Sequence, residues 1–525
     1  MANWSAGYVV DVEYTHGFYQ ELTPSLLGFL ALLQGIQAPD LGSSLAYCEL
    51  GCGQGFSTNL LAAANPHIQF HATDFNPGHI VGAQSLAQAG GLQNAHFYDD
   101  SFADFLDRSD LPDFDFICLH GIYSWISPEN RKTIVEFIRR KLKPGGLVYI
   151  SYNTMPGWAS MMPLRRLLLE HTAAQGSRLS GPSRVTNFID LADKLGKLDT
   201  RYFASHPKLA KRIEKLKDQN TNYIAHEYFN QDLEPFYFTD LAQELAEAKL
   251  TWVGPANAQE NLDEINLTKE QREFLAGIDD IALRQLTRDH IVDQQFRRDI
   301  FVKGAVHLSA QQVREQWLET RFVLSAKGSK IPRELRGLRH AVKLHSGIYD
   351  PLIAALEKGP STLREVIAEP TLAQAGFNRL VQALTILVAL GSCQPCLPAQ
   401  GLAERRLQTE RFNRAVANQS RFERKFSHFA SPVTGGGIAA DRMAQLMWLS
   451  LQDKEADTAR FVGTVLSAAG QRLMKDGKPL QGEAHDAELR QRVAEFEQNT
   501  LDVWAALGLN AAPSQESSKQ ARLRA

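Results

Sequence analysis

The chain has 525 residues, of which 44% are hydrophobic and 22% are charged, and its formal net charge is −3. This length predicts roughly two to four domains, and the small net charge excludes a global attraction to nucleic acid or to an anionic membrane. The five cysteines are few and odd in number, unlike a disulfide framework. We therefore expect a reducing, cytoplasmic location, no signal peptide and no membrane span.

Short apolar runs and helical patterns alternate from about residue 45 to 150. Strands are expected in "SLAYCEL", "IQFHATD", "AHFYDD", "FDFICLH" and "LVYISY". The helix before the last strand has Ser127 as its N-cap and Pro128 at its first position, and it is expected to stop at Pro144-Gly145-Gly146. This alternation predicts a doubly wound, Rossmann-like α/β core, whose ligands bind beyond the carboxyl ends of the strands.

Three glycines follow the first expected strand, in "AYCELGCGQGFST" (46–58). The missing side chains of Gly51, Gly53 and Gly55 let the backbone turn sharply and touch a ligand, and the next helix points its amides at the same place. A dinucleotide loop would carry its third glycine at position 56, which is Phe56 here. Glu49 would repel a diphosphate but attract the ammonium and sulfonium of S-adenosylmethionine.

Acids also follow the second and third expected strands. Asp74, with Phe75 beside it, can accept hydrogen bonds from ribose hydroxyls. Asp100 and Ser101 stand where a carboxylate can accept the adenine amino group. The ordered set of acids after three successive strands predicts an S-adenosylmethionine site, and it is far more specific than the glycines alone.

These motifs resemble the class I S-adenosylmethionine-dependent methyltransferases over about residues 40–155. A narrower resemblance is to bacterial methyltransferases with a methyltransferase regulatory domain, a group that includes the rickettsial lysine methyltransferases of outer-membrane proteins. Its motifs are "YTHGFYQELTPSLL" (14–27), "LHGIYSWIS" (119–127), "SYNTMPGW" (151–158), "YIAHEYFNQDLEPFYFTDL" (223–241) and "SPVTGGGI" (431–438).

The resemblance implies a class I core with a helical insertion, a winged-helix-like segment and a C-terminal helical region. It also implies that two late strands, near 250–257 and 297–305, form an antiparallel hairpin at one sheet edge. The expected divisions are an N-terminal segment closing the cofactor site (1–40), the core (41–308) with its insertion (about 160–235), a winged-helix-like regulatory segment (309–410), a mostly helical region (411–512) and a disordered tail (513–525).

Site roles follow from this resemblance. His120 and Gly121 are expected to line the methionine part of the cofactor, and Tyr14 to fold over it. A lysine acceptor has to lose a proton before it attacks. The candidates for the acceptor site and its chemistry are Tyr123, Asn153, His226 and Glu227, with Trp125 and Trp158 shaping the acceptor channel.

Several sequence features argue against particular functions, namely base methylation, zinc binding and DNA binding. The fourth strand ends in "CLHGIY", without the Asx-Pro-Pro-aromatic run of enzymes that methylate base amino groups. "CQPC" (393–396) is half of a tetrahedral zinc site, so no metal is expected. The expected third helix of the winged-helix-like segment offers only Arg379 as a cation, which favours protein packing or a homodimer through the C-terminal half over DNA binding.

The favoured interpretation is a methyltransferase acting on lysine side chains of a protein, with an envelope protein as one candidate acceptor. The large accessory regions favour a bulky acceptor. A small-molecule methyltransferase and an S-adenosylmethionine-binding regulatory protein without turnover stay open at this point.

Overall fold

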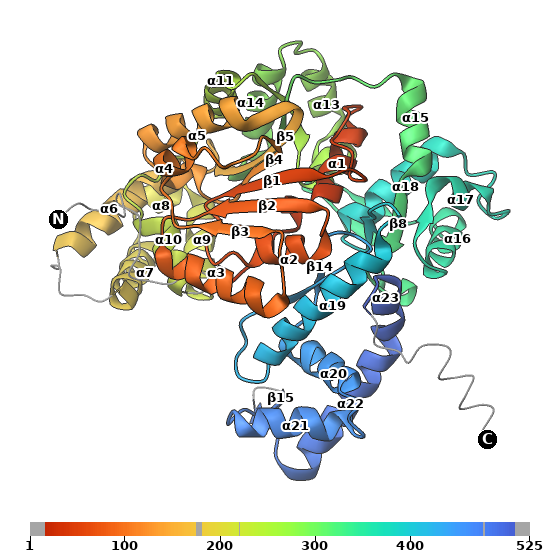
Figure 1. Cartoon of the computed structure of the whole chain (residues 1–525). Helices are drawn as coiled ribbons and strands as arrows, with labels where there is room; N and C mark the ends of the chain where they lie inside the picture. Colours follow the sequence, from red (N-terminus) through yellow and green to blue (C-terminus); the bar gives the residue numbers. More distant parts are fainter. Residues whose placement is uncertain (1–15, 175–180, 220, 476–477, 510–525) are drawn as a thin grey trace, which may run out of the picture.

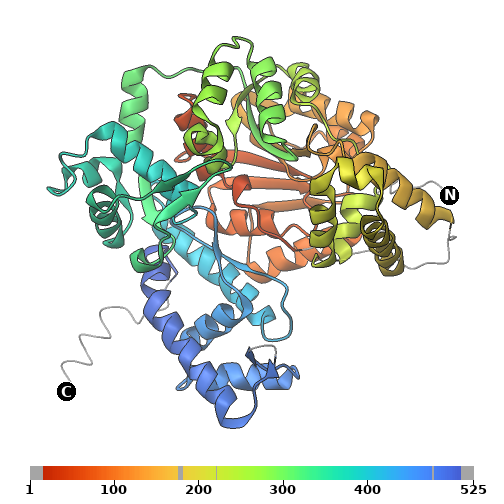
Figure 2. The same ribbon diagram turned by 180° about the vertical axis from the view of Figure 1, so that it is seen from behind.

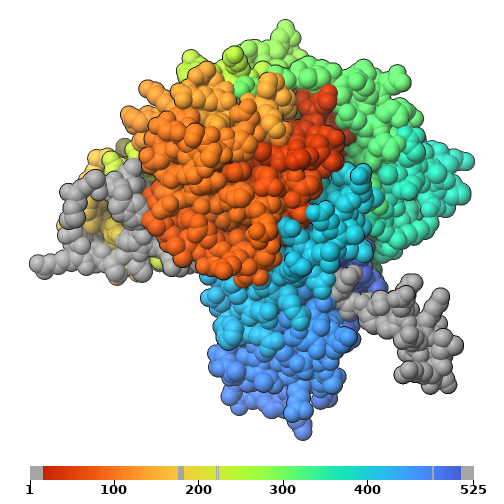
Figure 3. Space-filling model, viewed as in Figure 1, coloured from red at the N-terminus to blue at the C-terminus, as the bar shows by residue number. Residues whose placement is uncertain are grey.

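The computed structural model describes residues 16–174, 181–219, 221–475 and 478–509. Figure 1 shows a central sheet between helices, with the insertion helices on one side and the C-terminal half of the chain on the other. Figure 2 shows the same arrangement from behind. In the space-filling view of Figure 3, the C-terminal segments in blue form a lobe that projects from this body.

The central sheet has seven strands in the order β3-β2-β1-β4-β5-β7-β6. The first five run parallel, and β7 pairs antiparallel with both β5 and β6. Every residue of β1 and of β4 is buried, which explains their continuous apolar sequences. The predicted doubly wound core and the late hairpin are thereby confirmed. The strands are β1 Leu45–Leu50, β2 Ile68–Thr73, β3 Ala95–Tyr98, β4 Phe114–Leu119, β5 Leu142–Asn153, β6 Leu250–Pro255 and β7 Phe296–Lys303.

Helices cover both faces of the sheet. Tyr47 and Phe116 point into the face shared with α1, α2 and α3, whereas Ile117 and Val148 point into the face shared with α4, α5 and α11. Neighbouring strand residues therefore bury opposite faces, as the strand period requires. The helices are α1 Pro24–Leu33, α2 Phe56–Ala64, α3 Pro77–Gly90, α4 Phe102–Asp107, α5 Pro128–Lys141 and α11 Phe238–Ala246.

The junction between α5 and β5 differs from the prediction. α5 begins as expected, since the Ser127 side chain accepts a hydrogen bond from Asn130 N. However, β5 starts at Leu142, so Pro144-Gly145-Gly146 lies inside the strand rather than in a loop before it. Leu142 pairs with Phe114, and the register then shifts before the regular pairing continues. The buried side chain of Leu142 anchors this early start, and the Pro-Gly-Gly stretch forms an irregularity within the strand.

The insertion between β5 and β6 contains a small helical unit. Its helices enclose their own apolar core, which includes Phe188, Leu209 and Ile213. Trp125 and Trp158 belong to the same core and join it to the carboxyl ends of β4 and β5. The helices are α6 Met161–Ala174, α7 Gly181–Lys197, α8 Arg201–Ser205, α9 Pro207–Lys217 and α10 Thr221–Phe229.

The segment after β7 packs on the edge of the core. A three-stranded sheet, in the order β11-β8-β12, is accompanied by several helices. The second half of α18 is buried, and α18 contacts the 3-10 helix η3 (Ala258–Asn261) of the core, in line with its apolar sequence. The elements are α15 Ala310–Glu319, β8 Arg321–Leu324, η4 Gly328–Lys330, β9 Glu334–Arg336, β10 Ala341–Lys343, α16 Ser346–Glu357, β11 Ser361–Thr362, α17 Leu363–Ala368, α18 Phe377–Ala389 and β12 Cys393–Pro395.

The helix α19, Leu402–Gln419, connects the C-terminal lobe to the core by packing across α2 and α3. The Gln408 side chain donates hydrogen bonds to Ala62 O at 3.0 Å and to Asn94 Oδ1 at 2.9 Å. The helices that follow are α20 Arg442–Gln452, α21 Thr458–Ala468, α22 Gly482–Asn499 and α23 Leu501–Ala506. Among the described residues, every helix is too short or too polar to cross a membrane.

A buried ion-pair network ties β7 to its neighbours. Arg297 lies between two carboxylates, with NH1 2.6 Å from Asp289 Oδ1 and Nε 2.7 Å from Asp299 Oδ2. Asp299 also accepts hydrogen bonds from Tyr152 OH at 2.7 Å and from Trp252 Nε1 at 2.9 Å. The strands β5, β6 and β7 and the helix α14 (Ile281–Val292) are therefore joined through the Arg297–Asp299 ion pair.

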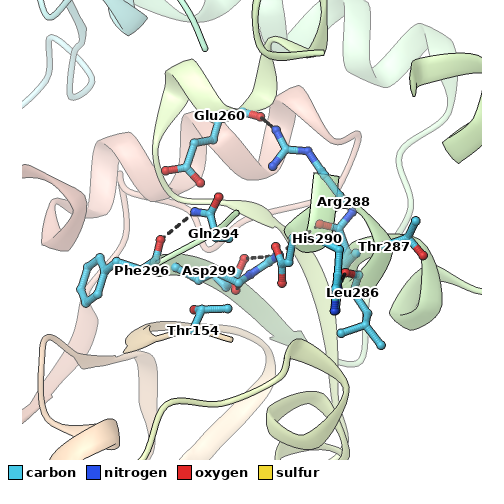
Figure 4. Close-up of polar contacts among 12 residues, drawn as sticks. Thr154, Glu260, Leu286, Thr287, Arg288, His290, Gln294, Phe296 and Asp299 are labelled. Carbon is cyan, nitrogen blue, oxygen red and sulfur yellow. Dashed lines mark hydrogen bonds and ion pairs between the residues drawn. The ribbon is translucent and has the colours of Figure 1, made fainter. Parts of the chain in front are cut away.

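Polar contacts beside this network hold the surrounding loops. Gln294 Nε2 donates to Phe296 O at 2.7 Å, and Arg288 NH2 donates to Glu260 O at 3.1 Å (Figure 4). Figure 4 also shows Asp299 among these residues, on the strand that they surround. This end of β7 is consequently fixed from both sides.

Candidate active site

A pocket, here called the glycine-loop pocket, lies at the carboxyl ends of β1, β2 and β4. The structure brings ten predicted cofactor residues together around it: Glu49, Gly51, Gly53, Gly55, Asp74, Phe75, Asp100, Ser101, His120 and Gly121. Tyr14, the eleventh, lies outside the described residues. The ordered acids and glycines of the sequence thus converge on one cavity, as the parallel topology requires.

The loop after β1 needs glycine at two positions. Gly51 and Gly55 have φ values of +72° and +65°, where side chains are strained. A Cβ on Gly51 would lie 2.7 Å from Ile122 Cγ2, and one on Gly55 would lie 2.5 Å from Ala83 Cβ. The loop backbone therefore packs directly against Ile122 and Ala83. The helix α2 begins at the residue after Gly55.

Asp74 holds the loop while it faces the pocket. Its Oδ2 accepts from Gly53 N at 2.9 Å, and its Oδ1 accepts from Asn76 N at 3.0 Å and lies 3.1 Å from His79 Nδ1. A carboxylate offers about four acceptor positions, so these three donors leave room for about one ligand hydroxyl. The sequence suggested that both ribose hydroxyls would bind there.

Glu49 is a buried carboxylate on the wall of the same pocket. Thr58 Oγ1 donates a hydrogen bond to its Oε2. Burial raises the pKa of Glu49 to about 7, and the negative charge of Asp74 adds to this rise although the Thr58 hydrogen bond opposes it. A cation bound beside this pair of acids would relieve their repulsion.

The third acid, Asp100, stands at the far end of the pocket. Its Oδ2 accepts from Arg108 NH1 at 3.0 Å, and Ser101 caps α4 by accepting from Asp104 N at 3.2 Å. Phe102 lines the pocket beside them. This end therefore combines an apolar ring with a fixed carboxylate.

The N-terminal segment covers the opposite end of the pocket. The Tyr19 ring stacks on His120, with 3.6 Å between their centroids, and Gly17 O accepts from Ser57 Oγ at 3.1 Å. A hydrogen bond of 2.8 Å joins His120 Nδ1 to Tyr149 OH. Burial, with a contribution from Arg298, lowers the pKa of His120 to about 3. The imidazole is therefore neutral near pH 7 and adds no positive charge to the pocket.

A second pocket, here called the α9 pocket, opens beside the first. The two share Tyr19, His120, Gly121 and Trp125, so a group in one can meet a group in the other at this boundary. The remaining walls of the α9 pocket come from β5, β7 and the insertion, and include Asn153, Trp158, Arg212, Glu227, Tyr228 and Phe296.

Glu227 is the notable acid of the α9 pocket. Its residue is 8% exposed, and burial raises the pKa of its carboxyl to about 7, against the opposing influence of Arg212 and the Asn153 amide. Arg212 lies over the Trp158 ring, with 4.1 Å between Cζ and the ring centroid. A carboxyl with this pKa can accept and release a proton near neutral pH.

Two predicted acceptor-site residues lie elsewhere. Tyr123 is buried in the core beneath α11, and its hydroxyl donates to Glu244 Oε2 at 2.6 Å. His226 is 2% exposed and lines neither pocket. Successive helical residues point about 100° apart, so α10 can direct Glu227 into the α9 pocket and His226 away from it. Asn153, Trp125 and Trp158 do line that pocket.

Sequence reasoning missed several residues of the α9 pocket. Tyr19, Phe296 and Arg298 come from segments far apart in the chain. Tyr19 stands in the motif "YTHGFYQELTPSLL" (14–27), but only Tyr14 was chosen from it. Arg298 pairs with Glu21, its NH1 lying 2.6 Å from Oε1, which ties β7 to the N-terminal segment. The consecutive arginines at 297 and 298 were a usable signal, since neighbours on a strand face opposite sides.

The fold and the glycine-loop pocket define the class. A doubly wound sheet with an antiparallel edge hairpin carries a glycine loop after β1 and acids at the carboxyl ends of β1, β2 and β3. This is the arrangement of a class I S-adenosylmethionine-dependent methyltransferase.

Comparisons with known proteins agree with this class. The family model of a methyltransferase domain matches residues 48–148, and that of a predicted methyltransferase regulatory domain matches residues 220–303. An uncharacterized protein of Synechocystis sp. is 42% identical over 510 residues, which cover 97% of this chain and all of that protein. An uncharacterized protein of Rickettsia prowazekii is 28% identical over 290 residues, covering 55% of this chain and 51% of that protein.

Solved structures show the same fold over nearly the whole chain. PKMT2 from Rickettsia typhi, alone and in complex with AdoHcy, matches with a TM-score of 0.69 at 16% and 18% identity. Each match covers 93% of this chain and 99% of PKMT2. The chain belongs to the family of S-adenosylmethionine-dependent methyltransferases that carry a methyltransferase regulatory domain.

The cofactor is S-adenosylmethionine, and the residues present fit it. The charge of Asp74 contributes to the raised pKa of the buried Glu49, and the ammonium and sulfonium of the cofactor would relieve this repulsion. Asp74, Phe75, Asp100 and Phe102 all line the pocket, where Asp74 would accept from a ribose hydroxyl and the other three would hold the adenine. The neutral His120 leaves the sulfonium without a repelling neighbour.

Asp74→Ala is expected to weaken AdoHcy binding about 30- to 100-fold. The change removes the carboxylate that would accept from a ribose hydroxyl, and it leaves Gly53 N and Asn76 N without their acceptor. A hydrogen bond to a charged group contributes about 1.5–3 kcal/mol. Titration calorimetry with AdoHcy measures the affinity. The exposed Asp113, replaced by alanine, serves as control. Unchanged binding by Asp74→Ala would refute its assignment.

A hairpin from the C-terminal region braces the N-terminal cover of the pocket. Its strands are β13 His428–Ala430 and β14 Gly437–Ala439. The Phe18 ring lies 5.0 Å from the His428 ring, and Phe426 stacks on Phe56, the first residue of α2, at 4.6 Å. The motif "SPVTGGG" (431–437), which joins the two strands, therefore supports the segment that covers the cofactor pocket.

Gly437→Ala is expected to weaken AdoHcy binding about tenfold, or ~1.4 kcal/mol. A Cβ at Gly437 would lie 2.5 Å from Phe18 Cε1, so the ring and its segment have to shift, and Tyr19 shifts with them. Gly347→Ala is the matched control, because nothing lies within 4 Å of its Cβ position. Equal affinities for both variants would show that the hairpin does not hold the cover.

Proposed function

We propose that the protein is a methyltransferase acting on lysine side chains of a protein. The observation that carries this proposal is the buried Glu227 on the wall of the α9 pocket, which meets the cofactor pocket at four shared residues. Its raised pKa, about 7, suits a base that takes a proton from an ammonium group.

The walls of the α9 pocket suit a lysine stem. Trp125, Trp158, Tyr228 and Phe296 offer apolar surface for four methylene groups. The lysine ammonium would reach Glu227 at the buried end of this channel. Exclusion of water there would favour the neutral amine, because burial disfavours the charged form of lysine.

Each residue then has a defined task. S-adenosylmethionine, when bound, supplies a methyl group activated by positive sulfur for in-line attack. Glu227 takes the proton of the acceptor ammonium, and the Asn153 amide interacts with this carboxylate. His120 and Tyr19 separate the two pockets except at the boundary where the reacting groups meet. Correct alignment of this kind contributes roughly 7–11 kcal/mol toward lowering a barrier.

The free cysteines support a cytoplasmic location, which is part of the proposal. All five are free, in agreement with a reducing compartment. We therefore place the protein in the cytoplasm, where an envelope protein could be methylated before export. The winged-helix-like character of residues 309–410 and a homodimer through the C-terminal half belong to the same proposal.

The test is transfer of labelled methyl groups into cell extract. Purified protein and labelled S-adenosylmethionine are incubated with the extract, and proteins are then separated from small molecules. Label in protein, recovered as methyl-lysine after hydrolysis, supports the proposal. Label in the small-molecule fraction would instead support a metabolite methyltransferase. Cofactor binding without any transfer would support a regulatory binder.

A further inference from the structure

The helix α9 presents positive charge at the mouth of the α9 pocket. Its apolar face, formed by Leu209, Ile213 and Leu216, is buried in the insertion core. The opposite face carries Lys211 and Lys215, which are both exposed. These residues are four apart and therefore neighbours on the helix surface.

Lys215 belongs to the pocket itself. It lines the α9 pocket together with the exposed Gln219, whereas Glu227 lines it from a buried position. The pocket thus runs from a cationic mouth to an acidic interior. Lys211 extends the cationic surface by one helical turn away from the mouth.

These two lysines differ from Lys208 and Lys217 of the same helix. Lys208 pairs with Asp293 at 2.8 Å, and Lys217 pairs with Asp193 at 2.6 Å. Within the described parts of the chain, no carboxylate lies within 4.0 Å of the Lys211 or Lys215 amine. Of the other two cations that line the pocket, Arg298 is balanced by Glu21, and Arg212 lies over the Trp158 ring and influences Glu227. Uncompensated positive charge is therefore concentrated at the entrance.

We propose that this entrance selects acceptor segments in which acidic residues flank the methylated lysine. The inference rests on the proposed function, which it deepens by naming the substrate class. Carboxylates beside the acceptor lysine would pair with Lys211 and Lys215 while the lysine enters the pocket. Basic flanks would be repelled, because like charges disfavour approach as strongly as opposite charges favour it.

The pattern of charge favours an acidic peptide over a nucleic acid. Glu214, whose side chain is 71% exposed and pairs with Lys217 at 2.9 Å, lies between the two lysines in sequence and interrupts the cationic surface. Two cations one turn apart match separate carboxylates on a short segment. A polyanion would instead require a longer positive track.

The test compares three fluorescent eleven-residue peptides that bind the full chain saturated with AdoHcy. Each has a central lysine flanked by five glutamates, five serines or five arginines on either side. Fluorescence anisotropy is expected to show the glutamate peptide binding about tenfold tighter than the serine peptide, the scale that two exposed ion pairs reach together. The arginine peptide is expected to bind more weakly than both, and raised salt should shrink these differences.

A double charge reversal, Lys211→Glu with Lys215→Glu, is expected to invert this order of affinities. The matched control reverses Lys330 and Lys343, which are exposed on another part of the surface, and is expected to keep the parent's order. Equal affinities of the three peptides for the parent, or an unchanged order in the α9 variant, would overturn the inference. A twelve-nucleotide single-stranded DNA that displaces the labelled glutamate peptide at a lower concentration than the unlabelled peptide does would also overturn the inference.

A methylation assay separates this inference from the function on which it rests. If the glutamate peptide binds through α9 but its lysine receives no label, the lysine acceptor is wrong while the acidic-segment surface stands. If all three peptides bind equally and are labelled equally, the lysine acceptor stands and the selectivity is wrong.

Discussion

The Glu227→Gln variant is expected to lose methyl transfer by about 10²–10⁴-fold, the usual contribution of a general base. Its affinity for AdoHcy should stay within twofold of the parent, since Glu227 lines the α9 pocket and not the glycine-loop pocket. The amide keeps the size of the side chain but cannot take a proton. Single-turnover transfer of labelled methyl groups into the acceptor protein measures the loss.

The pH dependence of the methyl-transfer rate provides a second test of the role of Glu227. Because the folded-state pKa of Glu227 is raised to about 7, the carboxylate needed as a base is lost as the pH falls through 7. The parent's rate should therefore decline on the acid side with an apparent pKa near 7. In Glu227→Gln this limb should be absent from the residual rate.

The control for this variant is Glu264→Gln. Glu264 is exposed and, like Glu227, lies within residues 220–303, which match the predicted regulatory domain. It should transfer methyl groups at the parent's rate and with the parent's pH profile. A Glu227→Gln variant that retains more than a tenth of the parent's rate, with the acid limb intact, would show that another group or water takes the proton.

Arg297→Met is expected to lower the free energy of unfolding by about 3–5 kcal/mol, as removal of one partner from a buried ion pair does. The change leaves Asp289 and Asp299 buried without their guanidinium. Thermal denaturation followed by circular dichroism should show a melting temperature lower by about 3–5 °C.

The comparison variant is Arg333→Met, whose partner Asp350 is likewise in an ion pair at 2.7 Å. Both side chains of that pair are about half exposed, so the change should cost less than about 1 kcal/mol. If Arg297→Met melts within 2 °C of Arg333→Met, the buried network does not stabilise the sheet edge.

The cofactor side of the site was predictable because its signals are local. Gly51, Gly53 and Gly55 mark the loop by their spacing, and Asp74 and Asp100 mark the ends of the next strands. Parallel strands place all their carboxyl ends at one edge. Hence the order of motifs along the chain was sufficient to assemble this pocket.

The acceptor side was only partly predictable because its residues meet through tertiary packing. Glu227 and Asn153 could be chosen from motifs, but nothing local separates Glu227 from its neighbour His226. The rotation of α10 about its own axis, which its packing against the core sets, decides which of the two side chains enters the pocket. Tyr19 and Phe296 enter it from opposite ends of the core sequence, which no spacing rule describes.

The segment that matches a predicted regulatory domain, 220–303, is part of the catalytic fold. It contributes β6 and β7 to the central sheet and Glu227 and Phe296 to the α9 pocket. The core is therefore unfinished without it. A regulatory effect of this segment on transfer would act through the geometry of the pocket that it helps to build.

The late arrival of β7 has a consequence for biosynthesis. β5 ends at Asn153, and its outer edge pairs with β7, which starts at Phe296. At ordinary translation speeds the ribosome takes on the order of 10 s to make the chain between them. Throughout that interval the backbone groups of β5 lack their partner and can recruit a strand from another molecule. We therefore expect that edge to be the part of the nascent chain most exposed to wrong pairing until the hairpin closes it.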